Sequence, residues 1–163
     1  MKKILTILGI TVSLLILDVS VMPFFQINGH YPSLLFVFSI FLALLSERKE
    51  AIFIGIVSGL FQDLYFVGII GVNGISNLLV CLLACEIGRT IFKEKYFIPV
   101  LSCFLLSFIK GLIIIIISFF IKQKVAFNSV LFVSLYNFTI GLFMYRVVYN
   151  LNEKTWMKNY WKY

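Results

Sequence analysis

The sequence predicts an all-α integral membrane protein with six transmembrane helices. Of its 163 residues, 61% are apolar and only 13% are charged, whereas a soluble domain usually carries about 25% charged residues. The apolar residues form runs of about 17–25 residues, the length that a helix needs to cross a bilayer. These runs cover nearly the whole chain, so we expect one transmembrane domain over residues 1–149 and a basic, aromatic tail over residues 150–163.

The first three helices are separated by short polar segments. The run Ile4–Met22 resembles a signal peptide, but Asp18 interrupts it and no small-residue cleavage site follows, so we expect an uncleaved helix. The second run, about Pro32–Ser46, is short and begins at a proline, a residue that is frequent in the first turn of helices. The third run, Ala51–Val67, follows the charged stretch at residues 46–50.

The last three helices follow a glycine-rich turn, Gly68–Gly74. The fourth run is about Ile69–Ile87, and a basic loop separates it from the fifth run, Phe97–Ile121. The sixth run is Ala126–Tyr149. Glycines punctuate the junction between the third and fourth runs, and a re-entrant element at this junction is the alternative to a simple turn.

The basic residues predict the orientation of the chain. If the N-terminus is inside, six spans place 11 of the 14 Lys and Arg residues on the inner side, in agreement with the positive-inside rule. These residues are Lys2, Lys3, Arg48, Lys49, Arg89, Lys93, Lys95, Arg146, Lys154, Lys158 and Lys162. The outer side then holds only Lys122 and Lys124, so we expect a multi-pass protein with both termini in the cytoplasm. In this topology the first, third and fifth helices run parallel.

The net charge of +7 does not predict nucleic-acid binding, because the polar segments are too short to form such a surface. In the tail, Trp156, Tyr160, Trp161 and Tyr163 lie among lysines. This pattern is typical of an anchor at the surface of the lipid bilayer. A tail that binds a protein partner is the alternative.

Three lone charges, Asp18, Asp63 and Lys110, interrupt otherwise apolar runs. A charge in a membrane helix is energetically expensive, so it usually faces the interior of the bundle and marks a function or a structural pairing. At about 1.5 Å per residue, each of these charges lies about 18–21 Å from the inner end of its helix. We therefore expect them in one layer of the membrane, with Asn77 near this layer and Asn73 one turn closer to the outside.

A polar layer of this kind has three interpretations. The first is structural: an ion pair between Lys110 and one of the two aspartates, with amide side chains satisfying the remaining groups. The second is a site for a small molecule or an ion that is open to the outside. The third is a polar surface on which another membrane helix docks.

A G-x-x-x-G step in the third run, Gly55 and Gly59, predicts a close approach of another helix backbone. The same helix face continues through Gln62 and Asp63, so this stripe of the helix is small and polar. Packing within the same chain and contact with another subunit are both compatible with the pattern.

Catalytic and metal-binding motifs are absent from the sequence. The three cysteines, Cys81, Cys85 and Cys103, lie in apolar runs, and the single histidine, His30, lies in a loop. A structural zinc site needs four ligands, so we interpret the cysteines as small packing residues. No nucleophile motif and no phosphate-binding glycine loop are found either, and we expect a protein without enzymatic activity, metal or cofactor.

The middle third of the chain resembles the rod shape-determining protein MreD family of bacteria. The residues that carry the resemblance are Pro32-Ser33-Leu34-Leu35-Phe36, then Gly55-x-x-x-Gly59-Leu60-Phe61-Gln62-Asp63-Leu64, then Gly71-Val72-Asn73-Gly74. They lie within residues 32–85, and the small size, the six hydrophobic segments and the basic, aromatic end of the chain also agree. Ser33 departs from the family pattern, in which we expect an acidic residue at this position in many members.

The resemblance implies a non-catalytic scaffold or regulator of the cell-elongation complex in the bacterial cell membrane. It implies a role in cell-shape maintenance and lateral peptidoglycan synthesis. The implied partners are an MreC-like bitopic protein, a RodA-like polymerase, a penicillin-binding transpeptidase and MreB. It implies a fold similar to the S components of energy-coupling-factor transporters, and no catalytic residues. Gly59, Asp63 and Asn73 match the family pattern and are candidates for a packing or docking role.

An S component that binds a vitamin near its outer face is the alternative function. The polar layer suits such a site, but the first helix lacks the series of alanines with which S components usually contact their transporter partner. A structural membrane subunit of another complex is the third interpretation.

Overall fold

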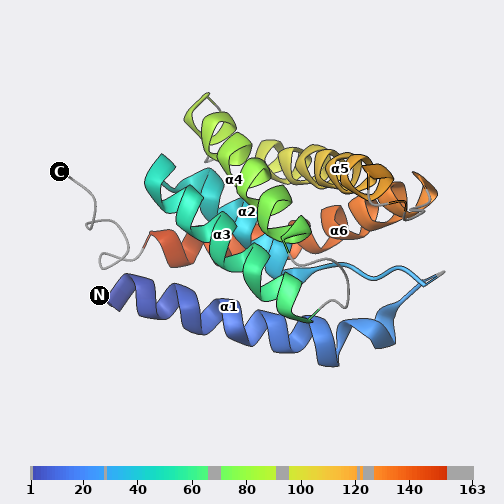
Figure 1. Ribbon diagram of the computed structural model, residues 1–163. Coiled ribbons are helices and arrows are strands. Elements are labelled where there is room, and N and C mark those ends of the chain that lie inside the picture. Colours follow the sequence, from blue (N-terminus) through green and yellow to red (C-terminus); the bar gives the residue numbers. More distant parts are fainter. Residues whose placement is uncertain are drawn as a thin grey trace.

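The six predicted helices are present in the computed structural model, which describes residues 2–27, 29–65, 71–90, 96–120, 122 and 127–153. They are α1 (Lys2–Ser20), α2 (Leu34–Leu45), α3 (Arg48–Tyr65), α4 (Val72–Thr90), α5 (Phe97–Phe120) and α6 (Phe127–Asn152), and the short 3₁₀ helix η1 (Met22–Phe25) follows α1. Helices α1, α3 and α5 run in one direction and α2, α4 and α6 in the other (Figure 1). The described residues form no strand, so the all-α prediction is confirmed.

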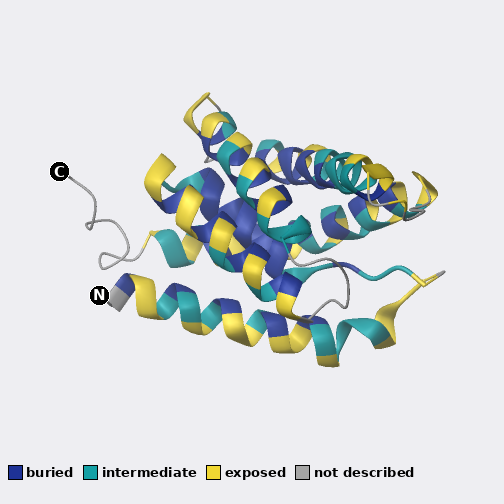
Figure 2. Ribbon diagram, in the orientation of Figure 1, coloured by how far each residue is buried: buried dark blue, intermediate teal, exposed yellow. Residues whose placement is uncertain are grey.

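Helix α2 is the centre of the bundle. Every residue from Leu35 to Leu44 is buried, and the helix is enclosed by its neighbours (Figure 2). A helix that is apolar on all sides needs protein or lipid on all sides, and here α1, α3, α4, α5 and α6 supply it. Its 12 residues span about 18 Å, less than the roughly 30 Å of hydrocarbon in a bilayer.

Four helices, α1, α4, α5 and α6, are long and apolar enough to cross a membrane by length and composition. The chain is therefore a multi-pass membrane protein. Helix α2 is apolar but short. Helix α3 begins three residues before the predicted run and so includes Arg48, Lys49 and Glu50. A lysine at the start of α1, Lys3, forms a buried ion pair with Glu50 of α3 and joins the two helices at this end of the bundle.

The G-x-x-x-G step packs against α4 of the same chain. A Cβ atom added at Gly59 would lie 2.5 Å from Gly74 Cα, and one added at Gly55 would lie 2.8 Å from Leu78 Cα. Real Cβ atoms do not approach backbone atoms so closely, so only glycine permits this separation of the two helices. Gly88 of α4 similarly lies against the backbone of Leu44 in α2.

The predicted glycine turn is shorter than expected. Helix α4 begins at Val72, so Asn73 and Gly74 belong to its first turn and not to a loop. Gly71 precedes the helix with φ +104°, a left-handed conformation that favours glycine. Residues 66–70 lie outside the described part of the chain, and so does the alternative of a re-entrant element there. Residues 154–163, most of the predicted tail, also lie outside it.

Candidate functional site

Asp18 binds the N-terminus of helix α2. Its side chain is only 1% exposed, and its oxygens accept hydrogen bonds from the Leu34 amide at 2.7 Å and the Leu35 amide at 3.1 Å. The Ser33 hydroxyl donates to the same carboxylate at 2.8 Å. The first amides of a helix have no partner within the helix, and the helix dipole favours a negative charge at this end. Asp18 therefore fixes the start of α2 against the end of α1.

Asp63 does the same for helix α4. Its carboxylate accepts hydrogen bonds from the amides of Gly71, Asn73 and Gly74 at 2.9, 3.0 and 2.9 Å. Both aspartates thus lie near the end of one helix and satisfy the start of the next. Their function in the bundle is the same, because unpaired amides cost several kcal/mol in hydrocarbon.

Lys110 has no acidic partner among the described residues. It is 8% exposed. Its ammonium group donates a hydrogen bond to Gln62 Oε1 at 2.9 Å and lies 4.2 Å from the centroid of the Phe36 ring, a cation–π contact. The expected ion pair between Lys110 and an aspartate is wrong. The physical reason is that helix N-termini occupy both carboxylates.

Gln62 connects the polar side chains of the bundle. Its amide nitrogen donates to Ser33 Oγ at 2.8 Å, and its oxygen accepts from both Lys110 and Asn77. Asn77 also donates to Ser58 at 3.2 Å, and its own oxygen has no partner in the described part of the chain. In the structure, Ser33 and Gln62 connect Asp18, Asn77 and Lys110 through hydrogen bonds. Asp63 lies next to Gln62 in sequence, but it is directed to α4.

Asn137 of α6 extends this network and was not among the predicted site residues. Its oxygen accepts from the Ser33 amide at 3.1 Å, and its nitrogen donates to Ser107 of α5 at 2.6 Å. The signal in the sequence is the position of Asn137 in the middle of the run, whereas the other asparagines of α6 lie near its ends. In the sequence, Ser33 stands out only as a departure from a family pattern. In the structure it is the N-cap of α2 and accepts from the Phe36 amide at 3.2 Å.

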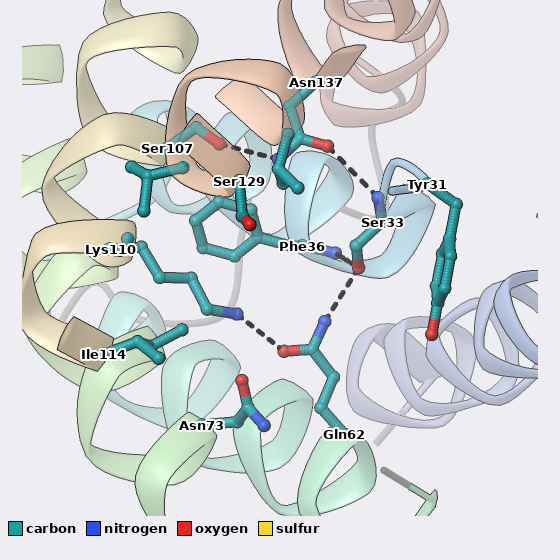
Figure 3. A pocket seen from close by; sticks show the side chains of 13 residues that line it. Tyr31, Ser33, Phe36, Gln62, Asn73, Ser107, Lys110, Ile114, Ser129 and Asn137 are labelled. Atoms are coloured by element: carbon teal, nitrogen blue, oxygen red, sulfur yellow. Dashed lines mark hydrogen bonds between the residues drawn. The ribbon is translucent and has the colours of Figure 1, made fainter. Parts of the chain in front are cut away.

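A cavity of about 250 Å³ lies beside this network (Figure 3). It is at the end of the bundle where α1, α3 and α5 end. Lys110 and Gln62 extend toward each other at its edge, and Asn73 and Ser129 lie close to the same space. The lining residues are Tyr31, Ser33, Phe36, Gln62, Asn73, Ser107, Lys110, Gly111, Ile114, Ser129, Val130, Val133 and Asn137.

The described residues contain no group of His, Cys, Asp and Glu that is arranged to hold a metal ion. The three cysteines are buried, in accordance with their interpretation as packing residues. The chemical capacity of the site is therefore that of its hydrogen-bond donors: an ammonium group, amides and hydroxyls around a mainly apolar cavity.

The fold and the site define a class: a multi-pass helical membrane protein whose buried polar groups join the helices into one bundle. The chain belongs to the MreD family, since the family model described as rod shape-determining protein MreD matches residues 1–155. This match confirms the resemblance and extends it from the middle third to almost the whole chain. The chain therefore has a role in rod shape determination, and its partners are membrane-associated.

Comparison with curated proteins and with solved structures finds no match. The expected likeness to S components of energy-coupling-factor transporters stays a prediction.

Proposed function

We propose that this protein is a non-catalytic scaffold of the cell-elongation complex in the bacterial cell membrane, where it supports lateral peptidoglycan synthesis. Its partners in this proposal are an MreC-like bitopic protein, a RodA-like polymerase and a penicillin-binding transpeptidase, with MreB bound directly or through them. The family match is the first support. The observation that carries the proposal is that both membrane aspartates hold helix N-termini.

This use of the aspartates is what a rigid scaffold needs. A carboxylate that acts as a general acid or base must exchange a proton with a substrate, whereas Asp18 and Asp63 each accept three hydrogen bonds from their own chain. A network that connects α1 to α6 through Ser33, Gln62 and Asn137 fixes the helices relative to one another. The outer faces of the bundle then present constant apolar surfaces to lipid and to partner helices.

Partner helices have no access to the Gly55–Gly59 stripe, since α4 covers it. We place partner contacts on exposed apolar faces instead. One such face is on α1, where Leu5 and Ile16 are 66% and 55% exposed, and another is on α6, where Phe143 is 80% exposed.

Purification of the tagged full-length protein from its native host in mild detergent tests the proposal. Mass spectrometry of the co-purified proteins should find MreC-like, RodA-like and penicillin-binding proteins. Two variants locate the contact: Phe143→Ala changes the exposed face of α6, and Gly9→Ala adds one methyl group to the exposed face of α1, where no atom lies within 4 Å. Loss of the partners from Phe143→Ala but not from Gly9→Ala would assign the contact to α6.

An S component is the second candidate function, and the cavity beside Lys110 is the observation that favours it. Recovery of ABC-type ATPases with a coupling membrane subunit, and of no elongation proteins, would replace the scaffold proposal with this one.

A further inference from the structure

Lys110 forms no ion pair with an acidic side chain in the part of the chain that the structure describes. An ammonium group in a membrane bundle is expensive unless it is paired or solvated. Gln62 Oε1 takes one of its three donor positions. The Phe36 ring covers another side of the group, and the cavity lies next to it. The side chain is therefore placed to receive an anion from the cavity.

Two further donors border the same cavity. The side chains of Asn73 and Ser129 line it, and neither forms a hydrogen bond with any residue in the described ranges. They come from the start of α4 and the start of α6. Together with Lys110 on α5, they surround the cavity with an ammonium group, an amide and a hydroxyl (Figure 3). Oxygen atoms of an anion accept hydrogen bonds from all three kinds of group.

The two aspartates do not prevent an anion from binding here. Asp18 is separated from Lys110 by Ser33 and Gln62. Asp63 is directed to three amides of the α4 N-terminus. Each carboxylate is partly offset by the positive end of a helix dipole, about half an elementary charge, and neither lines the cavity.

The rest of the cavity wall is apolar and includes Ile114, Val130 and Val133. Its volume of about 250 Å³ is slightly below the range of roughly 300–1,000 Å³ for small-molecule sites. A cavity of this size accommodates a phosphate group and a few carbons of the molecule that carries it. We propose that it binds a phosphate ester with an apolar body, with the phosphate at Lys110, Asn73 and Ser129 and the apolar part against Ile114, Val130 and Val133.

This chemistry is common to a membrane phospholipid and to a water-soluble phosphate ester, so the test uses one probe of each kind. The purified full-length protein in nonionic detergent is titrated with short-chain phosphatidylglycerol or with octyl phosphate, and native mass spectrometry counts the bound molecules. Octyl glucoside, which has the same chain as octyl phosphate but no charge, is the neutral control. Binding of only phosphatidylglycerol would identify a membrane lipid as the ligand, and binding of only octyl phosphate a soluble ester.

The variant Lys110→Gln should weaken phosphate binding about tenfold or more, because it removes a charge-assisted hydrogen bond. The matched control is Lys122→Gln, which removes the same charge from an exposed turn just after α5 and should leave the affinity unchanged. A second variant, Val133→Phe, retains the ammonium group and places a larger side chain in the apolar part of the cavity. It should weaken octyl phosphate binding as well, and it carries the test if Lys110→Gln does not fold.

Equal affinity of Lys110→Gln and Lys122→Gln for the phosphate probes would overturn the inference. The absence of binding of both phosphate probes to the unaltered protein would also overturn it, and so would equal binding of octyl glucoside and octyl phosphate. None of these outcomes bears on the scaffold proposal, which depends on the proteins that co-purify.

Discussion

At the residue scale, the two membrane aspartates show why a charge is tolerated inside this bundle. Each replaces the water that would otherwise solvate the free amides of a helix start. Asp18 binds the start of α2 and Asp63 the start of α4, so the same contact occurs in two of the three consecutive helical pairs, α1–α2 and α3–α4. The buried carboxylate and the buried helix start stabilise one another, and each would be unfavourable alone.

The variant Asp63→Ala should lower the stability of the protein, because it leaves three amides of α4 without their acceptor. We expect a loss of about 1–3 kcal/mol in the free energy of unfolding. The thermal unfolding midpoint of the purified protein in detergent measures it. The matched control is Asp63→Asn, which keeps one oxygen acceptor and should lose less. An unchanged midpoint in Asp63→Ala would contradict this assignment of Asp63.

A charge swap distinguishes the observed contacts from a direct ion pair. If Lys110 paired with Asp63, the double variant Asp63→Lys/Lys110→Asp would partly restore the stability that each single change removes. The structure shows no ion pair between them, so we expect the two losses in unfolding free energy to add, within roughly 0.5 kcal/mol. Thermal unfolding of the single and double variants completes the cycle. Clear rescue would show that the two side chains interact directly.

At the element scale, the separation of α3 and α4 depends on glycine. A Cβ atom at Gly59 would collide with the backbone of Gly74, and neither partner is a flexible side chain that can move aside. Because Asp63 binds the start of α4 on the same face of α3, this close approach also brings the carboxylate within reach of its three amides. The packing of the two helices and the capping of α4 are therefore coupled.

The variant Gly59→Ala should separate α3 from α4 and destabilise the protein by about 1–3 kcal/mol, as overpacking usually does. Gly9→Ala is the matched control, since a Cβ atom at Gly9 meets nothing within 4 Å and alanine favours the helix by about 1 kcal/mol. We expect a lower thermal midpoint for the first variant and an equal or higher one for the second. The opposite order would show that α3 and α4 do not pack through this glycine.

At the scale of the whole molecule, the helices enclose a short central helix. Helix α2 needs no contact with lipid, because its neighbours bury it from Leu35 to Leu44. Its polar start, at Ser33, meets α1, α3 and α6 through Asp18, Gln62 and Asn137. The opposite end holds the buried ion pair of Lys3 and Glu50, and the network and the cavity with Lys110 make the end near Ser33 polar as well.

We expect this polar end to face the outside of the cell, with both termini in the cytoplasm. Lys49 is exposed at the start of α3, and Lys122 is exposed just after the end of α5. Because α3 and α5 run in the same direction, the two lysines lie at opposite ends of the bundle. A cysteine introduced as Lys122→Cys should react with a membrane-impermeant maleimide in whole cells, and one introduced as Lys49→Cys should react only after lysis. The native cysteines are buried and serve as the background. The reverse labelling pattern would invert the topology.

The sequence by itself determined the class of the protein and its helices. Apolar runs of membrane length predict helices wherever they occur, because backbone amides in lipid must bond within their own segment. The ends of the helices agree with the predicted runs within a few residues, and α3 begins earlier because Arg48 to Glu50 continue the helix. The family motifs near Gly59 and Asp63 were equally local, so they too were visible in the sequence.

Only the tertiary structure decided which polar groups meet. Opposite charges in one layer suggest an ion pair. In the structure, however, each aspartate binds a helix N-terminus, and Lys110 contacts Gln62 and Phe36. Hydrogen bonds and close packing depend on distances of a few tenths of an ångström between segments far apart in the chain. The apolar runs predict where each helix lies, but not these distances.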